Sequence, residues 1–275
     1  MAKPKINKGS QIIDSATELL NDKVKSLEPK FLNLLLDEIK KLDVRGGGIV
    51  SSTKRNKAFI RSFRERVRKL LTKTKYFDFV DGFLLSYDDL NNFTKDINKR
   101  VNQITIPTAQ LSKWRTWGVD KVSFDLVKQG LDTSLIKPLR NELTKVVNLG
   151  GNMKDLAQAL ENTLQPIGRA GGLLTTNSYQ VSRDALGQYY GSINQQIADT
   201  FDLDGIRYVG SLINDSRDQC KRWVDKKVLA VKDLQSEINW AFANGTGMIK
   251  DTTPSNFLQN RGGYNCRHTA IPVRL

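Results

Sequence analysis

Apolar residues recur at helical spacing along most of the chain. A first stripe predicts a helix that Ser10 can cap, and Pro29 is expected to end it before a second apolar stretch, Phe31–Leu42. The short run Tyr76–Val80 is expected to form a strand or an extended link. Further helices are predicted over residues 54–75, 90–104, 111–126, 134–147, 153–164 and 175–201.

Strand-like alternation is concentrated near the C-terminal end. Ile206–Ser211 alternates between apolar and polar residues, and Thr269–Val273 predicts an edge strand because Pro272 has no N–H for a central ladder. Between these strands, a loop and a short helix are expected over residues 215–223 and another helix over residues 234–242. The pattern as a whole predicts a mostly α-helical fold with a small C-terminal α+β cap and a helical N-terminal extension.

Length and composition support an organised chain of more than one part. The 275 residues are 39% hydrophobic and 26% charged, which suffices for buried cores. We expect three consecutive regions: a basic helical region (1–86), a helical middle region (87–172) and an α+β module (173–275). No apolar run approaches the roughly 20 residues that cross a bilayer, so no membrane span is expected. With two cysteines and no secretory signal, synthesis in a reducing cytoplasm is expected.

Positive charge is concentrated in one predicted helix. The net charge is +14, and residues 54–75 alone carry ten basic residues against one acid. Basic residues at helical spacing beside an apolar stripe suit contact with a polyanion such as DNA. The candidate DNA-binding residues are Lys54, Arg55, Lys57, Arg61, Arg64, Arg66, Arg68, Lys69 and Lys73.

Three other roles remain open for this basic helix. It can be the solvated face of a packed helix, or a docking surface for an acidic protein. It can also lie on a membrane surface, although the segment has no Trp to anchor it there.

The two cysteines and the single histidine lie near the C-terminal end. The spacing of Cys266 and His268 suits metal ligation, and Cys220 can supply a third ligand. A set of thiolates and an imidazole favours zinc, with Asp215 or Asp218 as a fourth ligand. The three residues are therefore a candidate zinc site.

Several other roles for the same residues also remain open. The cysteines can simply pack in a small core or form a disulfide, and His268 can bond a backbone carbonyl. A Cys220–His268 nucleophile pair lacks an identifiable orienting group, so catalysis is not expected. A metal-dependent hydrolase would need a carboxylate cluster, whereas Asp215, Asp218 and Asp225 are expected to serve turns and caps.

Several motifs over residues 120–275 carry a resemblance to a known family. They are the helix pair split at Leu149–Met153, the long helix after Thr175–Asn177, Tyr208–Ser211 with Asn214–Cys220, Trp223–Val228, and Arg261–His268 with its terminal Asn265-Cys266-Arg267-His268. With these motifs the C-terminal part resembles the bacteriophage Mu F-like minor head proteins, also called minor capsid or head morphogenesis proteins. Lys226 stands where that family usually has Gly, and His268 where a second Cys is common.

The resemblance implies a structural virion protein, not an enzyme. Such a protein would be made in the host cytoplasm and would lie at the portal vertex or head interior. It would contact the portal, other head proteins and packaged DNA, and would aid head assembly, DNA packaging or ejection. The alternative, from the charge alone, is a stand-alone nucleic-acid-binding protein.

Overall fold

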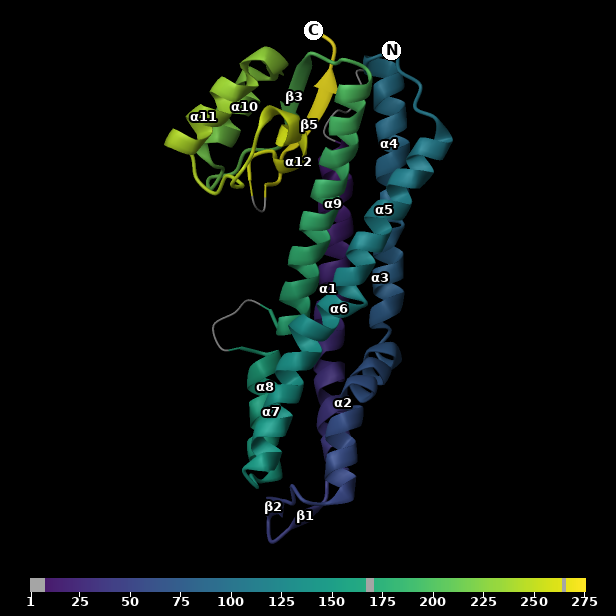
Figure 1. Ribbon diagram of the computed structural model, residues 1–275, viewed down its shortest axis with the longest axis vertical. Helices are drawn as coiled ribbons and strands as arrows, with labels where there is room; N and C mark the ends of the chain where they lie inside the picture. The colour runs from purple at the N-terminus through teal and green to yellow at the C-terminus, as the bar shows by residue number, and fades with distance from the viewer. Residues whose placement is uncertain (1–7, 167–170, 264–265) are drawn as a thin grey trace. The chain divides into compact units, whose positions relative to one another are not determined.

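A computed structural model describes residues 8–166, 171–263 and 266–275, and its fold is mostly α-helical with a small C-terminal α+β part. Figure 1 shows the helices and strands. In chain order they are α1 (Lys8–Ile39), β1 (Val44–Arg45), β2 (Gly48–Ile49), α2 (Lys54–Lys73), α3 (Tyr76–Leu84), α4 (Ser86–Val101), α5 (Thr108–Leu126), α6 (Gln129–Leu131), the π-helical turn η1 (Asp132–Ile136), α7 (Lys137–Asn148), α8 (Met153–Leu164), α9 (Leu173–Thr200), β3 (Gly205–Val209), α10 (Asp218–Lys226), β4 (Val228–Ala230), the 3₁₀ turn η2 (Val231–Asp233), α11 (Leu234–Asn244), the 3₁₀ turn η3 (Pro254–Asn256), α12 (Phe257–Asn260) and β5 (Thr269–Val273).

The chain forms two compact units, each made of segments that are distant in sequence. The first unit comprises residues 1–17, 84–121 and 182–275, and the second comprises residues 18–83 and 122–181. The three consecutive regions expected from the sequence, 1–86, 87–172 and 173–275, are a different kind of division and stay a prediction.

The first unit contains the three-stranded sheet, in the order β4-β3-β5 with both pairings antiparallel. β5 is an edge strand, as its Pro272 predicted, and it pairs Pro272 with Ile206. Two buried side chains cover the backbone of β5: Asn102 donates to the Pro272 carbonyl at 3.0 Å and Asn194 to the Ala270 carbonyl at 3.0 Å. These bonds satisfy edge carbonyls that would otherwise be buried without partners.

The second unit contains the basic helix α2. Its apolar stripe is buried as predicted, and Thr53 caps the helix by accepting from the Asn56 backbone N–H. The glycine-rich segment before it forms the turn of a β1–β2 hairpin in which Gly46 and Gly47 have φ of +55° and +84°. Buried Asn56 fixes the hairpin to α2 by hydrogen bonds to the backbone of Asp43 and Val50.

Two expectations about this unit were wrong. Residues 76–80 are helical, because Tyr76, Val80 and Phe83 also lie at helical spacing and bury one face of α3. A short apolar run fits both the helical period of 3.6 residues and the strand period of two, so tertiary packing decides which structure forms. Pro29 does not end the first helix, since α1 continues through it. Pro29 is exposed, so water can satisfy the carbonyl that its missing N–H leaves free.

Candidate metal centre and basic helix

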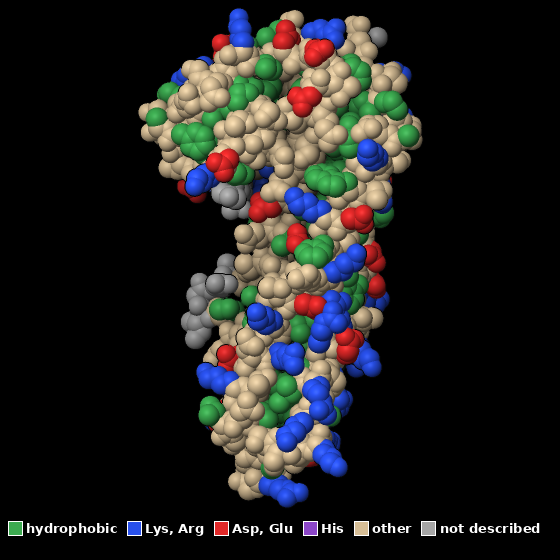
Figure 2. Space-filling model, in the orientation of Figure 1, with side chains coloured by type: hydrophobic (Ala, Val, Ile, Leu, Met, Phe, Trp, Pro, Cys, Tyr) green, Lys and Arg blue, Asp and Glu red, His purple; other side chains and the backbone are tan. Residues whose placement is uncertain are grey.

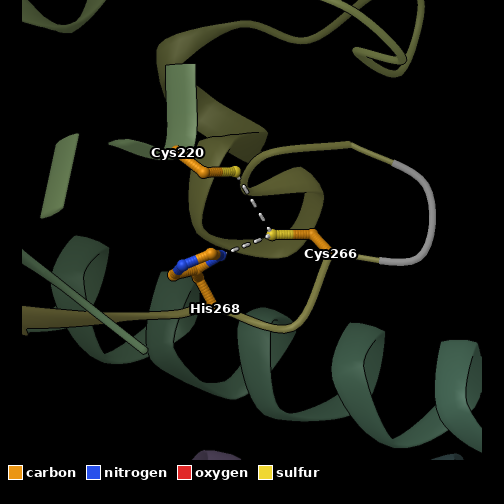
Figure 3. A group of neighbouring side chains, drawn as sticks. All are labelled: Cys220, Cys266 and His268. Atoms are coloured by element: carbon orange, nitrogen blue, oxygen red, sulfur yellow. Dashed lines mark hydrogen bonds between the residues drawn. The ribbon is translucent and has the colours of Figure 1, made fainter. Parts of the chain in front are cut away.

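Cys220, Cys266 and His268 come together in the first unit. Figure 3 shows Cys220 from α10 facing Cys266 and His268, which lie just before β5. The Cys220 and Cys266 Sγ atoms are 3.9 Å apart, and Cys266 Sγ lies 3.7 Å from His268 Nδ1. All three residues are buried, and their ligand atoms lie within 4.8 Å of one another. The structure therefore brings all three predicted ligands to one point, and the cluster can hold a metal ion.

A network of polar contacts holds the loop before Cys266 against the start of α10. Arg217 Nη1 donates to the Gly262 carbonyl at 2.7 Å, and buried Gln219 donates to the same carbonyl at 3.2 Å. Gly262 is required there, because a Cβ would lie 2.4 Å from Cys220 Sγ and 2.9 Å from Cys266 Sγ. Close approach of the backbone thus shapes one wall of the cluster.

Two of the three separations are close to those of a tetrahedral zinc site. Zinc–sulfur bonds of about 2.3 Å and zinc–nitrogen bonds of about 2.0 Å imply sulfur–sulfur edges of about 3.8 Å and sulfur–nitrogen edges of about 3.5 Å. The 3.9 Å between the two Sγ atoms and the 3.7 Å between Cys266 Sγ and His268 Nδ1 are close to these values, and the third pair of ligand atoms lies within 4.8 Å. The donor chemistry and two of the three separations therefore fit zinc.

Tyr208, on β3, is a member of this cluster that the sequence did not indicate as a site residue. Its hydroxyl lies 3.5 Å from Cys220 Sγ and 3.3 Å from Cys266 Sγ, and its ring stacks on that of His268 with centroids 5.4 Å apart. Burial raises its pKa well above the usual range, so the hydroxyl remains a proton donor toward the sulfur atoms. Alternation predicted a strand at Tyr208 but could not indicate which residues its side chain would contact.

The two thiols differ in acidity. The pKa of Cys266 is held well below its usual range, chiefly by its hydrogen bond with Cys220. The hydrogen bond with His268 and the positive charge of Arg261 lower it further. The pKa of Cys220 is raised by its bond to Cys266 and by burial. Because the two sulfur atoms share a hydrogen bond, the thiols titrate as a pair and not independently. Both cysteines are free thiols in the structure.

The candidate fourth ligands are not equivalent. A cavity of about 110 Å³ opens beside the cluster, and its lining includes Asp215 but not Asp218. Asp218 lies at the start of α10 and pairs with Lys221 at 3.4 Å. Asp215 is therefore the better placed of the two, while the cavity also has room for water as the fourth ligand.

His268 differs from a usual zinc-binding histidine in one respect. Its Nε2 is buried and has no hydrogen-bond partner among the described residues. The ring nitrogen opposite the metal normally donates to a carboxylate or carbonyl, which fixes the ring. Here stacking on Tyr208 orients the ring instead.

Comparison with known protein families, curated proteins and solved structures gave no match. No helix in the described ranges is long and apolar enough to span a membrane.

The candidate DNA-binding residues divide into two groups. In the second unit, Arg64 and Arg68 pair with Asp132 at 2.6 Å and 3.1 Å, and Arg66 pairs with Glu38. Arg55 reaches Asp43 at 3.3 Å. Arg68 also donates to the Val127 carbonyl at 2.8 Å, so it connects α2 to the chain around η1. These arginines have structural partners.

The other candidates are exposed and make no ion pair within the described parts of the chain. They are Lys54, Lys57, Arg61, Lys69 and Lys73. A ligand can reach their charges without breaking an ion pair, whereas a phosphate would have to compete with carboxylates for the paired arginines.

Proposed function

We propose that this chain is a phage minor head protein, a structural component of the virion at the portal vertex or head interior. One observation carries the proposal. The turn that ends in Cys220 and the terminal Cys266-Arg267-His268 are separate parts of the family resemblance, 46 residues apart at their cysteines, yet they form one buried cluster. Tyr264 and Asn265 of that terminal motif lie outside the described residues.

Zinc held by Cys220, Cys266 and His268 would act as a structural clamp in the α+β part. It would link α10 to the segment that enters β5, two elements that a small three-stranded sheet does little to hold together. Tyr208 would donate a hydrogen bond to a ligating thiolate. The clamp would stabilise a surface for docking on the portal or other head proteins.

In this proposal the exposed cations of α2 contact packaged DNA through its phosphates. An alternative function, favoured by the same cations, is that of a stand-alone nucleic-acid-binding protein. The two differ in location, because the alternative predicts that the protein is absent from particles.

Mass spectrometry of purified particles tests the virion assignment. We expect the protein to co-purify with particles and with the portal in few copies. Its absence from particles whose portal is readily detected would overturn the assignment.

Elemental analysis of the purified full-length protein tests the zinc site. We expect one zinc per chain, and loss of zinc in Cys266→Ser and His268→Ala. Asp215→Asn should weaken zinc binding about 10-fold or more if the carboxylate is a ligand, and Asp218→Asn is the matched control. Protein that neither contains zinc nor binds added zinc would refute the clamp without touching the virion assignment.

A further inference from the structure

A groove of about 790 Å³ lies in the second unit between α2 and the helix α7. Its lining residues are Arg64, Asp132, Thr133, Ile136, Lys137, Arg140, Asn141, Thr144, Lys145 and Asn148. Most of them belong to α7, which the sequence did not indicate as a binding element. The groove therefore extends the basic surface beyond the helix that the charge pattern identified.

The residues of α7 that line the groove share one face of the helix. They stand at positions one helical turn apart, 137, 140 and 141, 144 and 145, and 148: Lys137, Arg140, Asn141, Thr144, Lys145 and Asn148. On α2, Lys57 and Arg61 precede Arg64 at the same intervals and are exposed. Figure 2 shows Lys and Arg side chains gathered over the part of the molecule where Figure 1 labels α2 and α7.

The two helices run antiparallel along the groove. Arg64 meets Asp132, which lies just before α7, while β2 before α2 bonds to the chain just after α7 through Ile49 N–H and the Gly151 carbonyl at 2.9 Å. Arg64 of α2 therefore lines one side of the groove and the basic face of α7 lines the other, while Lys57 and Arg61 continue the basic row of α2 outside the groove.

The charge in the groove is strongly positive. Its lining contains four cationic side chains and one carboxylate, Asp132, and both Arg64 and Arg68 already pair with that carboxylate. The exposed amides of Asn141 and Asn148 make no hydrogen bond within the described residues, so both can donate to a ligand. Cations together with free amide donors suit phosphate oxygens.

The lining also distinguishes DNA from an acidic protein partner. Hot spots of protein interfaces are enriched in Trp, Tyr and Arg. The lining residues include no aromatic side chain, and Ile136, their one apolar side chain, is only 3% exposed. The groove thus offers a polyanion four cationic side chains and offers a protein no aromatic anchor.

We propose that the α2–α7 groove binds the phosphate backbone of duplex DNA. This inference rests on the DNA contact in the proposed function and adds the basic face of α7 to the surface that makes the contact. From Lys137 to Asn148 the helix rises about 16 Å, a length over which duplex DNA carries about ten phosphate charges. Binding is therefore sequence-independent and depends on the groove's cations.

The test is DNA binding by the full-length protein at several salt concentrations. The variant is Lys137→Glu/Arg140→Glu/Lys145→Glu, and the matched control is Lys95→Glu/Lys99→Glu/Arg100→Glu on α4, three exposed cations with the same charge change. Each phosphate contact contributes about 0.9 to the slope of log affinity against log salt. The α7 variant should therefore lose about 2.7 of that slope and at least 10-fold in affinity, while the control keeps most of both. Glutamine in place of glutamate should give an intermediate loss, and circular dichroism checks folding.

Three outcomes would overturn the inference. If Lys57→Glu/Arg61→Glu abolishes binding and the α7 variant does not, DNA contacts α2 alone, and the proposed function stands without the groove. If the α7 variant binds DNA normally but blocks head assembly, the groove docks a protein. If the control loses as much as the α7 variant, the effect is one of net charge. The virion assignment is tested separately by particle composition.

Discussion

Neutralising Glu237 should weaken the first unit in a way that depends on pH. Glu237, on α11, is 7% exposed and accepts hydrogen bonds from Arg222 at 2.8 Å, Lys226 at 2.5 Å and Trp223 Nε1 at 3.1 Å, all on α10. Hydrogen bonds from Arg222, with those from Lys226, lower its pKa from the usual 4.5 to about 2. Since α10 also carries Cys220, this carboxylate helps to hold one side of the candidate metal site in place.

The magnitude follows from linkage between protonation and folding. At about 1.4 kcal/mol for each pKa unit, the difference between 4.5 and about 2 corresponds to about 3 kcal/mol of stability. Arg222 and Lys226 are 35% and 40% exposed, so water screens part of the interaction. We therefore expect Glu237→Gln to cost about 2 kcal/mol at pH 7. Because the folded-state pKa is lowered, this contribution is complete above pH 4.5 and is lost as the pH falls toward 2.

Denaturant unfolding followed by tryptophan fluorescence measures this difference. All four tryptophans belong to the first unit, so the signal reports that unit in the full-length chain: Trp114, Trp117, Trp223 and Trp240. Asp225→Asn is the control: Asp225 is an exposed carboxylate on α10 with no ion pair among the described residues, and its replacement should change stability by less than about 0.5 kcal/mol. A deficit in Glu237→Gln that stays constant from pH 7 to pH 2.5 would refute the electrostatic explanation.

Three further substitutions test the packing directly. Gly262→Ala should reduce zinc affinity at least 10-fold in a titration, because the added Cβ would lie 2.4 Å from Cys220 Sγ. Gly82→Ala is the control, since there is open space around Gly82, and equal zinc affinities in the two variants would contradict the close approach at Gly262. Lys227, at φ +62° and ψ −47°, occupies a strained conformation, so Lys227→Gly should raise stability by about 1 kcal/mol, and a lower melting temperature would refute this. Asn56→Ala removes three hydrogen bonds to the hairpin backbone and should cost about 2 kcal/mol of unfolding free energy, whereas a neutral effect would show that water replaces them.

Local periodicity in the sequence sufficed to predict most of the helices and the strands β3 and β5. The stripe on α2 is buried as expected, and β3 and β5 lie where alternation and Pro272 indicated. The two wrong predictions, at Pro29 and at residues 76–80, arose where tertiary packing overrode a local sequence rule. Pro29 lies on the exposed face of α1 and is tolerated there, and the run beginning at Tyr76 satisfied two periods at once.

The candidate site was predictable in part because its chemistry is rare in this chain. The only cysteines and the only histidine identified three members of the cluster. Tyr208 and Gly262 carry no such signal, since strand tyrosines and loop glycines are common, and only the fold shows what they face. For the same reason the sequence did not indicate α7 as a binding element. Its few basic residues do not stand out in the sequence, and only the packing of α2 beside α7 shows that they line a groove.

Two positions differ from the pattern of the family that we propose, and each makes a particular contact. His268, where a second Cys is common in that family, supplies a nitrogen at a distance from Cys266 Sγ that suits a tetrahedral zinc site. Lys226, where Gly is usual there, forms an ion pair with Glu237, and a positive φ falls on the next residue, Lys227. Residue identity at these positions is therefore a poor guide to whether a metal site or a turn can form. Donor chemistry at His268 and backbone conformation at Lys227 are better ones, because a metal site requires ligand atoms at fixed separations and a turn requires one residue with positive φ.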